Sequence, residues 1–578
     1  MRKDTLKRLL SYLRPYKTQV VLALLCAFAS VLLSLLGPVF IGRAIDAMLG
    51  PGRVQFAPIV RVLSLAGVAI ALSAVAGWGM QVLTRCLSAK ASQDIRRQVF
   101  TRLNEVPLRK LDRRRHGELA SRLVNDADAV AEGLMQGLGQ LFPGLVTILA
   151  TIGVMLVLNW VIALVVILIT PLSILFAQFV GRRTARFFRS MSNAQGATSG
   201  FVGEMVEGRR VLQDLGYEQE AGRQFDRLNA DYTREYRRAV LYSSFINPGT
   251  RFVNAIVFGA VAVLGGIYAI HGGITVGGLS VFLNYANQYT KPFNEVTAVL
   301  TQVQTAFASV ERLFEVIDWT PETPDAKGAL APSHSEGYVK AEEVCFSYNK
   351  EIPFIRSFSF ATQPGTRIAL VGPTGCGKTT IINLLMRFYE VDAGSITVDG
   401  QEIRTVRRDA LRSLYGMVLQ DSWLKQATVR DNIAYANPGA SDDEVVEAAK
   451  KALAHGFIKR LPQGYDTVLA RGGEDLSAGE KQLLCIARIM LAKPDMLILD
   501  EATSSIDTRT ELLIQKAMER LMVGRTSFVV AHRLSTIQNA DEILVMDAGQ
   551  IVERGRHEEL LEKGGFYAGL YNSQFGGV

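Results

Sequence analysis

The sequence predicts an α-helical domain that spans a membrane, followed by an α/β domain. Three observations lead to this prediction. The first half holds a series of long apolar segments, and the composition changes after Ile317. The second half then contains a short apolar strand that runs through a glycine-rich loop into a helix.

The overall composition agrees with a membrane protein. Of the 578 residues, 49% are hydrophobic and only 20% are charged, and the mean hydropathy is +0.18. The net charge of +8 lies in basic blocks between apolar runs, which disfavours a nucleic-acid-binding module. The five cysteines are odd in number and lack CxxC spacing, so neither a disulfide framework nor a zinc site is indicated.

About six segments are long and apolar enough to cross the hydrocarbon of a bilayer, which takes ~20 helical residues. The connections expected outside are short, whereas those expected inside are long and rich in Lys and Arg. By the positive-inside rule, the N-terminus and the second half are predicted to be cytoplasmic. The predicted spans are residues 20–47, 56–83, 135–158, 161–180, 252–270 and 276–293.

The long inner connections keep helical apolar spacing, so each is predicted to form two antiparallel helices that project from the membrane. Their tips, expected at residues 112–118 and 209–218, are candidate docking points. Basic loops held at anionic lipid are an alternative, although they do not account for the length of these connections.

A Pro-, Ser- and Gly-rich stretch separates the two halves. The predicted domains are therefore a transmembrane domain at residues 1–317, a linker at 318–337 and a nucleotide-binding domain at 338–578.

The segment "IALVGPTGCGKTT" has the strand, loop and helix of a phosphate-binding motif. Glycines allow backbone N–H groups to surround phosphates, and the start of the helix adds a partial positive charge. Lys378 is expected to reach the β- and γ-phosphates of a nucleotide, and the Thr379 hydroxyl is expected to bind Mg²⁺. Cys376 is interpreted as a tolerated small residue. The predicted phosphate-loop residues are Gly372, Pro373, Thr374, Gly375, Cys376, Gly377, Lys378, Thr379 and Thr380.

Two further strands end in polar residues. The strand in "MLILDEATSSID" ends in Asp500, predicted to orient Mg²⁺, and Glu501, predicted to act as general base on the attacking water. The strand in "TSFVVAHRLS" ends in His532, which either caps the strand or senses the γ-phosphate.

In this order the motifs resemble those of the ATP-binding cassette (ABC) family, and the preceding spans resemble its exporter-type half-transporters. The resemblance implies a six-helix transmembrane domain and an α/β nucleotide-binding domain with a helical signature subdomain. It also implies ATP and Mg²⁺ as cofactors, Gln420 as the loop glutamine linking Mg²⁺ to the membrane domain, Tyr348 stacked on adenine, and Asp507 in a loop facing a partner subunit.

The segment "LSAGEKQ" departs from the family's usual Leu-Ser-Gly-Gly-Gln signature. Ser477 and Glu480 fit a capping box, and the same helix start suits the γ-phosphate of ATP held by the opposite subunit. Ala478 adds a methyl group before Gly479, and Glu480 adds a negative charge near another anion. Both changes are expected to weaken the partner's site, while the other catalytic residues match the family.

This combination resembles one subunit of the heterodimeric exporters, so a different half-transporter is the expected partner. The predicted function is ATP-driven export of lipophilic or amphipathic compounds, such as drugs, lipids or peptides, across the inner (cytoplasmic) membrane. A homodimer, an importer of siderophores or metal chelates, and a nucleotide-gated channel stay open. A soluble cassette ATPase is disfavoured by the spans.

Overall fold

The computed structural model describes residues 2–48, 54–112, 114, 116–350, 352–419, 422–500, 507–531 and 534–575. The chain forms two compact units. The N-terminal unit consists of Met1–Glu105 and Arg114–Thr320, and the C-terminal unit consists of Val106–Arg113 and Pro321–Val578. The short segment Val106–Arg113 therefore belongs to the C-terminal unit, although it lies within the first half of the sequence.

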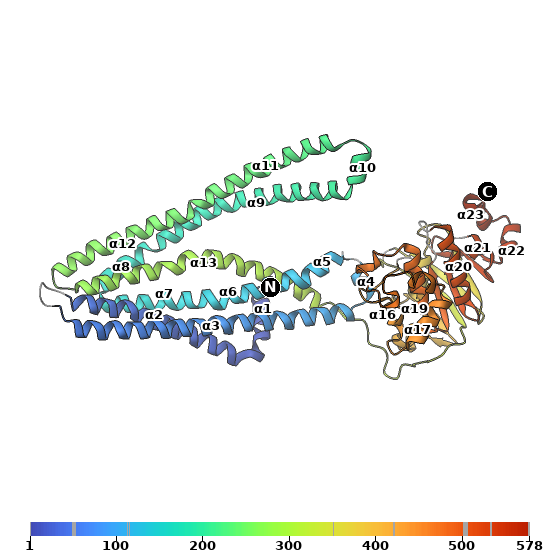
Figure 1. The fold of residues 1–578 in the computed structure, drawn as a ribbon, viewed down its shortest axis with the longest axis horizontal. Helices are drawn as coiled ribbons and strands as arrows, with labels where there is room; N and C mark the ends of the chain where they lie inside the picture. The colour runs from blue at the N-terminus through green and yellow to red at the C-terminus, as the bar shows by residue number, and fades with distance from the viewer. Residues whose placement is uncertain are drawn as a thin grey trace. The chain divides into compact units, whose positions relative to one another are not determined.

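Helices are the only regular secondary structure among the described residues of the N-terminal unit (Figure 1). Two π-helical turns, η2 (Arg122–Asp126) and η3 (Gly137–Leu141), join three of its helices into one continuous helix. The α-helices are α1 (Arg2–Leu13), α2 (Lys17–Asp46), α3 (Phe56–Glu105), α5 (His116–Ser121), α6 (Ala127–Gln136), α7 (Phe142–Leu158), α8 (Trp160–Ile169), α9 (Pro171–Glu207), α10 (Arg209–Asp214), α11 (Glu218–Ser244), α12 (Ile246–Ile270) and α13 (Val276–Ile317).

Among the described residues, four helices are long and apolar enough to cross a membrane: Asp4–Asp46, Phe56–Glu105, Gly117–Leu158 and Glu218–Ile270. They contain four of the six predicted spans. The other two predicted spans fall on α8 with the start of α9, and on the first half of α13. The arrangement is consistent with six spans.

Gly277, near the start of the last predicted span, has a packing role. A Cβ atom built on Gly277 would lie 2.0 Å from the backbone oxygen of Gly42, so α13 and α2 touch backbone to backbone. Asp46 accepts hydrogen bonds from the Gly277 N–H and the Thr275 hydroxyl, both at 2.8 Å. The end of α2 thus caps the start of α13.

A cluster of charged side chains, here called the ion cluster, joins η2 to α13. Asp126 accepts hydrogen bonds from Ser309 Oγ and Arg312 Nε, both at 2.9 Å. Arg122, which is buried, donates to Glu315 at 2.8 Å, and also to Glu118. The ion cluster therefore fixes the helix that starts after residue 115 against the end of α13.

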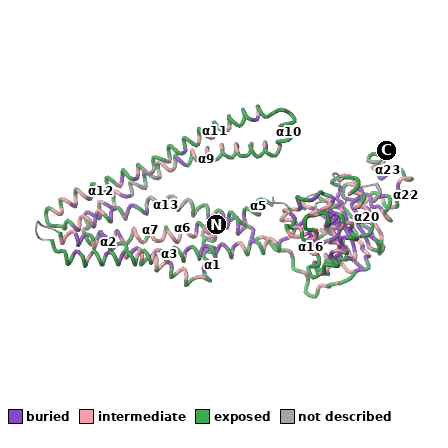
Figure 2. The backbone as a smooth tube through the Cα atoms, viewed as in Figure 1, coloured by how far each residue is buried: buried purple, intermediate pink, exposed green. Residues whose placement is uncertain are grey.

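A helical arm leaves the rest of the N-terminal unit. Helices α9 and α11 run antiparallel and α10 closes their tip, where Figure 1 shows the arm extending away from α6 and α13. Figure 2 shows that the arm is largely exposed, and Val211 and Leu215 at its tip are 60% and 74% exposed. The predicted tip at residues 209–218 coincides with α10.

The other predicted tip lies a few residues too late in the sequence. Helix α3 ends at Glu105, Pro107 stands at the N-cap of α4 (Leu108–Leu111), and the tip that packs in the C-terminal unit is Val106–Arg113 rather than residues 112–118. Proline cannot continue a helix because it lacks an N–H group, so Pro107 marks the break.

The C-terminal unit contains two sheets. The four-stranded sheet is antiparallel with the order β2-β1-β4-β5; the six-stranded sheet has the order β10-β9-β3-β8-β7-β6 and is parallel except for β10. The strands are β1 (Val339–Phe346), β2 (Ile355–Ala361), β3 (Arg367–Val371), β4 (Ala393–Val398), β5 (Gln401–Glu402), β6 (Tyr415–Val418), β7 (Met496–Asp500), β8 (Thr526–Val530), β9 (Glu542–Asp547) and β10 (Gln550–Gly555).

Helices cover the parallel strands, which are apolar along their length because both faces are buried. One core lies between the two sheets and α14, and a second lies under a helical part that includes α17 and α19. The helices are α14 (Lys378–Leu385), α15 (Arg408–Ser413), α16 (Val429–Ile433), α17 (Asp442–Lys451), α18 (His455–Ile458), α19 (Ala478–Ala492), α20 (Thr508–Met522), α21 (Leu534–Gln538), α22 (His557–Glu562) and α23 (Phe566–Phe575), in addition to α4.

Candidate functional site

The predicted motifs meet at one edge of the six-stranded sheet. Strands β3, β8 and β7 are parallel neighbours, with Leu370 opposite Val530 and Val530 opposite Asp500. All three strands therefore end at the same edge, which is where open α/β sheets bind ligands. The phosphate loop follows β3, and Asp500 is the last residue of β7.

The phosphate loop depends on its glycines. Gly375 and Gly377 have φ angles of 85° and 112°, a region that side chains with a Cβ rarely adopt. A Cβ atom on Gly372 would lie 2.2 Å from the carbonyl oxygen of Met546. Gly377 is also the N-cap of α14, so the loop delivers the start of that helix to the sheet edge.

Lys378 is buried against this loop. Its ammonium group donates to the carbonyl oxygens of Gly372 at 2.7 Å and Pro373 at 3.1 Å. Cys376, interpreted as a tolerated small residue, is buried in the first core. The loop thus holds a cation among backbone amides, an arrangement suited to a phosphate chain.

Tyr348 lies beside the phosphate-loop helix. Its hydroxyl is 2.9 Å from Thr380 Oγ1, and its ring packs edge-on against Phe346, Phe354 and Tyr389. Thr380 is buried, whereas its neighbour Thr379 is exposed at the first turn of α14. The loop that carries Tyr348 is therefore tied to the phosphate loop by a side-chain hydrogen bond.

The altered signature forms the predicted capping box at the start of α19. Ser477 accepts a hydrogen bond from the Glu480 N–H, and the Glu480 carboxylate accepts from the Ser477 N–H at 3.0 Å and the Ser477 hydroxyl at 2.9 Å. Ala478 is exposed and Gly479 is buried. Helix α19 packs in the second core, whereas the phosphate loop closes over the first.

Asp507 is the N-cap of α20. The backbone N–H of Thr510 donates to its carboxylate at 3.0 Å, and this hydrogen bond lowers the pKa of Asp507. The three residues predicted to act on the attacking water and on Mg²⁺, namely Gln420, Glu501 and His532, lie outside the described residues. Their neighbours Leu419, Asp500 and Ala531 are described.

The structure also shows contacts that the sequence reasoning did not anticipate. Arg109 of α4 donates to the backbone oxygens of Tyr348 and, at 3.4 Å, Ser347. The Tyr389 hydroxyl donates to Asp112, and burial together with this hydrogen bond raises the pKa of Tyr389. Helix α4 is thus bonded to the loop that carries Tyr348. The break at Pro107 is the only sequence signal that points to α4.

Replacing Tyr389 by phenylalanine is expected to loosen α4. The variant keeps the ring contacts with Phe346 and Tyr348 but loses the hydrogen bond to the Asp112 carboxylate. Loss of a hydrogen bond to a charged group raises the equilibrium constant for local opening roughly tenfold. Backbone hydrogen exchange in Val106–Arg113 is therefore expected to be about tenfold faster in the variant.

The control is Tyr415→Phe in the same core. The Tyr415 hydroxyl is buried and has no hydrogen-bond partner among the described residues, so its removal leaves α4 untouched. Equal exchange of Val106–Arg113 in both variants would contradict the role of Tyr389.

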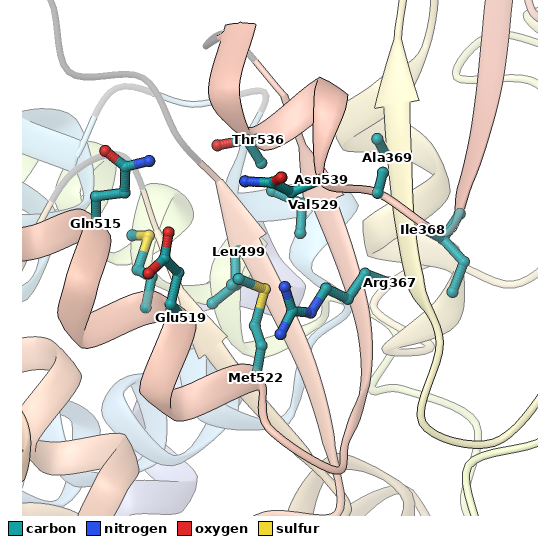
Figure 3. A pocket seen from close by; sticks show the side chains of 12 residues that line it. Arg367, Ile368, Ala369, Leu499, Gln515, Glu519, Met522, Val529, Thr536 and Asn539 are labelled. Atoms are coloured by element: carbon teal, nitrogen blue, oxygen red, sulfur yellow. The ribbon is translucent and has the colours of Figure 1, made fainter. Parts of the chain in front are cut away.

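A small cavity of about 30 Å³ lies on the face of the six-stranded sheet below α20. Figure 3 shows Gln515, Glu519 and Met522 of α20 facing Leu499 and Val529 of the strands. The space is that of about one water molecule, and no residue of the phosphate loop lines it. This cavity is separate from the predicted nucleotide site.

Comparisons with known proteins agree with this geometry. The family model described as "ABC transporter transmembrane region" matches residues 20–293, and the model described as "ABC transporter" matches residues 355–504. The chain belongs to the ABC transporter family. The second match contains the phosphate loop, the altered signature and Asp500.

Relatives and a solved structure extend the similarity over nearly the whole chain. An uncharacterised ABC transporter ATP-binding protein of Bacillus subtilis, YfiC, is 40% identical over 99% of this chain and 94% of its own length. A fatty acid ABC transporter ATP-binding/permease protein of Mycobacterium bovis is 41% identical over 89% of this chain and 82% of its own length. The structure of a bacterial Atm1-family ABC exporter with ATP bound superposes with a TM-score of 0.77 at 29% identity, over 97% of this chain and 98% of that one.

The protein is therefore an ABC exporter half-transporter located in a membrane, and it couples ATP hydrolysis to transport. The predicted architecture, a helical transmembrane domain followed by an α/β nucleotide-binding domain, is confirmed. ABC exporters act as dimers, so each functional unit of this transporter contains a second half.

Proposed function

We propose that this chain is the catalytically competent half of a heterodimeric exporter of lipophilic or amphipathic compounds. It lies in the inner (cytoplasmic) membrane, with its N-terminus and nucleotide-binding domain in the cytoplasm. ATP hydrolysis at its own phosphate loop drives alternation between inward- and outward-facing states.

The observation that carries the pairing is the Glu480 carboxylate at the signature helix. Both polar groups that Ser477 presents at the start of α19, its N–H and its hydroxyl, donate to this carboxylate. A γ-phosphate brought to the same helix start meets a negative charge and a serine that is already engaged. The site that this chain completes for its partner is therefore the weak one, and the partner supplies an ordinary signature to the phosphate loop of this chain.

The residues at the sheet edge fit Mg²⁺. Thr379 offers a hydroxyl at the first turn of α14, and Asp500 offers a carboxylate at the end of β7, which are the oxygen ligands that this ion prefers. With Gln420 they would hold Mg²⁺, which supplies positive charge to the β- and γ-phosphates. Lys378 binds the same phosphates, Tyr348 stacks on the adenine, Glu501 accepts the proton of the attacking water, and His532 orients that water.

The exposed tip of the helical arm supports dimerisation. Val211 within α10 and Leu215 directly after it are apolar side chains left open to solvent in a single chain. A surface of this kind at the end of a long projecting arm suits contact with another protein. We assign it to the nucleotide-binding domain of the partner half.

The substrate class follows from the membrane segments. The segments α7 and α8 contain no charged residue, and the relative named for fatty acid transport supports a lipophilic cargo. Uptake of a metal chelate is the alternative. ATP-dependent accumulation of a lipophilic dye in inside-out vesicles supports export, whereas loss of chelate from those vesicles would support uptake.

The pairing is tested by expressing the chain alone. A purified homodimer with full substrate-stimulated ATP turnover would reject the heterodimer. Low turnover that rises when a second half-transporter is co-expressed supports it.

Glu480→Gln is expected to strengthen the weak site. The variant removes the negative charge beside the γ-phosphate and keeps a side chain that caps Ser477. Removing one unit charge at contact distance changes affinity about fivefold, so ATP-dependent dimerisation of the chain is expected to tighten by about that factor. Sedimentation with and without ATP measures it.

The matched control is Glu444→Gln. Ser441 and Glu444 form the same capping box at the start of α17, with the Ser441 N–H donating to Glu444 at 2.8 Å. This variant changes a cap of equal geometry outside the signature. Equal tightening in both variants would contradict the proposed effect of Glu480 on the γ-phosphate.

A further inference from the structure

An apolar groove of about 160 Å³ lies in the N-terminal unit between α1, the α6–η3 segment and α13. Every described residue that lines it is apolar. Leu6 and Leu10 belong to α1, Leu134 and Leu138 belong to the α6–η3 segment, and Phe307 belongs to α13. We call it the α1 groove.

The apolar stripe of α1 lines this groove, and half of the stripe stays exposed. Leu6, Leu9, Leu10 and Leu13 lie on one face, at the i, i+3, i+4 and i+7 spacing of an amphipathic helix. Leu9 and Leu13 are buried against α3 and α13, whereas Leu6 and Leu10 are 42% and 51% exposed. The exposed half of the stripe therefore faces an apolar space that the described residues do not fill.

Glycine keeps the α1 groove open. Gly137, at the first position of the π-helical turn η3, lines the groove, and a Cβ atom built on it would meet no atom within 4 Å. Empty apolar spaces of about 150 Å³ stay dry and take up small hydrocarbons. A volume of about 160 Å³ suits a single hydrocarbon chain.

The charge around α1 indicates which kind of molecule would bring a hydrocarbon chain to the α1 groove. The first 17 residues include six basic residues and one acidic residue, Asp4. Lys7 lies between Leu6 and Leu10 in sequence, is exposed, and forms no ion pair with a described residue. An amphipathic helix with basic residues beside its apolar stripe lies at the membrane surface and attracts anionic lipid.

We propose that the α1 groove binds one acyl chain of an anionic phospholipid from the adjoining leaflet, with the headgroup phosphate at Lys7. The bound chain completes the packing of Leu6 and Leu10. The lipid therefore acts as a structural ligand that holds α1 against α13, independently of the exported substrate.

The test uses the full chain in phosphatidylcholine nanodiscs that contain a phosphatidylglycerol with a photoactivatable group on its acyl chain. Irradiation is expected to label peptides of α1 and of the α6–η3 segment. Gly137→Leu fills the α1 groove and removes room for several methylenes, so labelling is expected to fall roughly tenfold or more. Gly153→Leu is the control: it lies on α7 of the same continuous helix, and its Cβ also meets no atom within 4 Å.

Two further variants test the same groove in case Gly137→Leu does not fold. Leu10→Ser alters an exposed side chain and is also expected to lower labelling, while Lys7→Gln is expected to remove the preference for phosphatidylglycerol over a phosphatidylcholine probe. Equal labelling in Gly137→Leu and Gly153→Leu would overturn the proposal. So would crosslinks from α1 to a second protein chain, since they would show that a partner helix covers the groove.

Discussion

Replacing Glu501 by glutamine is expected to lower steady-state ATP hydrolysis by roughly 10²–10⁴-fold, the usual contribution of a general base. Glutamine keeps the size of the side chain but cannot accept the proton of the attacking water. Glu501 directly follows Asp500, the last residue of β7. Strand β8, which pairs with β7, leads to His532, and β3, which pairs with β8, leads to the phosphate loop. Nucleotide binding does not need this carboxylate, so the variant is expected to bind ATP normally and to accumulate as a closed dimer with its partner.

The matched control for this experiment is Glu519→Gln. Glu519 is an exposed carboxylate on α20 that lines the small cavity away from the phosphate loop. Phosphate release and fluorescent-nucleotide binding are measured side by side for both variants. Unchanged hydrolysis in Glu501→Gln would show that Glu501 is not the general base. Loss of nucleotide binding in this variant would show that Glu501 instead supports the structure of the nucleotide site.

Lys378→Ala is expected to abolish turnover through a different step. The ammonium group already lies among the carbonyl oxygens of Gly372 and Pro373, so little movement is needed to reach bound phosphates. Hydrogen bonds from a cation to a charged acceptor are strong, and their loss is expected to weaken ATP binding by roughly 10-fold to 100-fold.

Binding of a fluorescent ATP analogue to the full chain measures this effect directly. Lys459→Ala removes an equal charge from an exposed position in the helical part and is expected to leave the affinity unchanged. An unaltered affinity in Lys378→Ala would contradict the assignment of the phosphate loop.

The two catalytic predictions separate binding from chemistry. Glu501→Gln is expected to bind ATP normally but not to hydrolyse it, whereas Lys378→Ala is expected to bind ATP weakly. A heterodimer with a weak second site adds a third expectation, that both variants remove nearly all the turnover of the pair.

Much of this architecture could be predicted from local sequence. Apolar runs of membrane-spanning length predict the helices of the N-terminal unit, because length and hydropathy are local properties. The capping box of Ser477 and Glu480 and the glycine geometry before Lys378 are equally local, and the structure contains both. Parallel β3, β7 and β8 could be expected from the order of the motifs.

Contacts between distant segments could not be predicted in this way. The hydrogen bond from Tyr389 to Asp112 joins residues far apart in the sequence, and no periodicity relates them. The predicted tip at residues 112–118 lies a few residues later than α4, because the chain breaks at Pro107 and the helical spacing of the connection does not reveal this break. The α1 groove depends on Gly137, which has no side chain to fill it. This glycine forms a groove only because α1 and α13 lie beside it in the fold.

The ion cluster has a consequence for the two places where the chain crosses between its units. The chain enters and leaves the nucleotide-binding unit through residues 105–114 and again near Thr320. Asp126 and Arg122 brace the returning helix against α13 just before the second crossing. Within the N-terminal unit, the ion cluster therefore ties together the two helical segments from which the chain runs into the C-terminal unit.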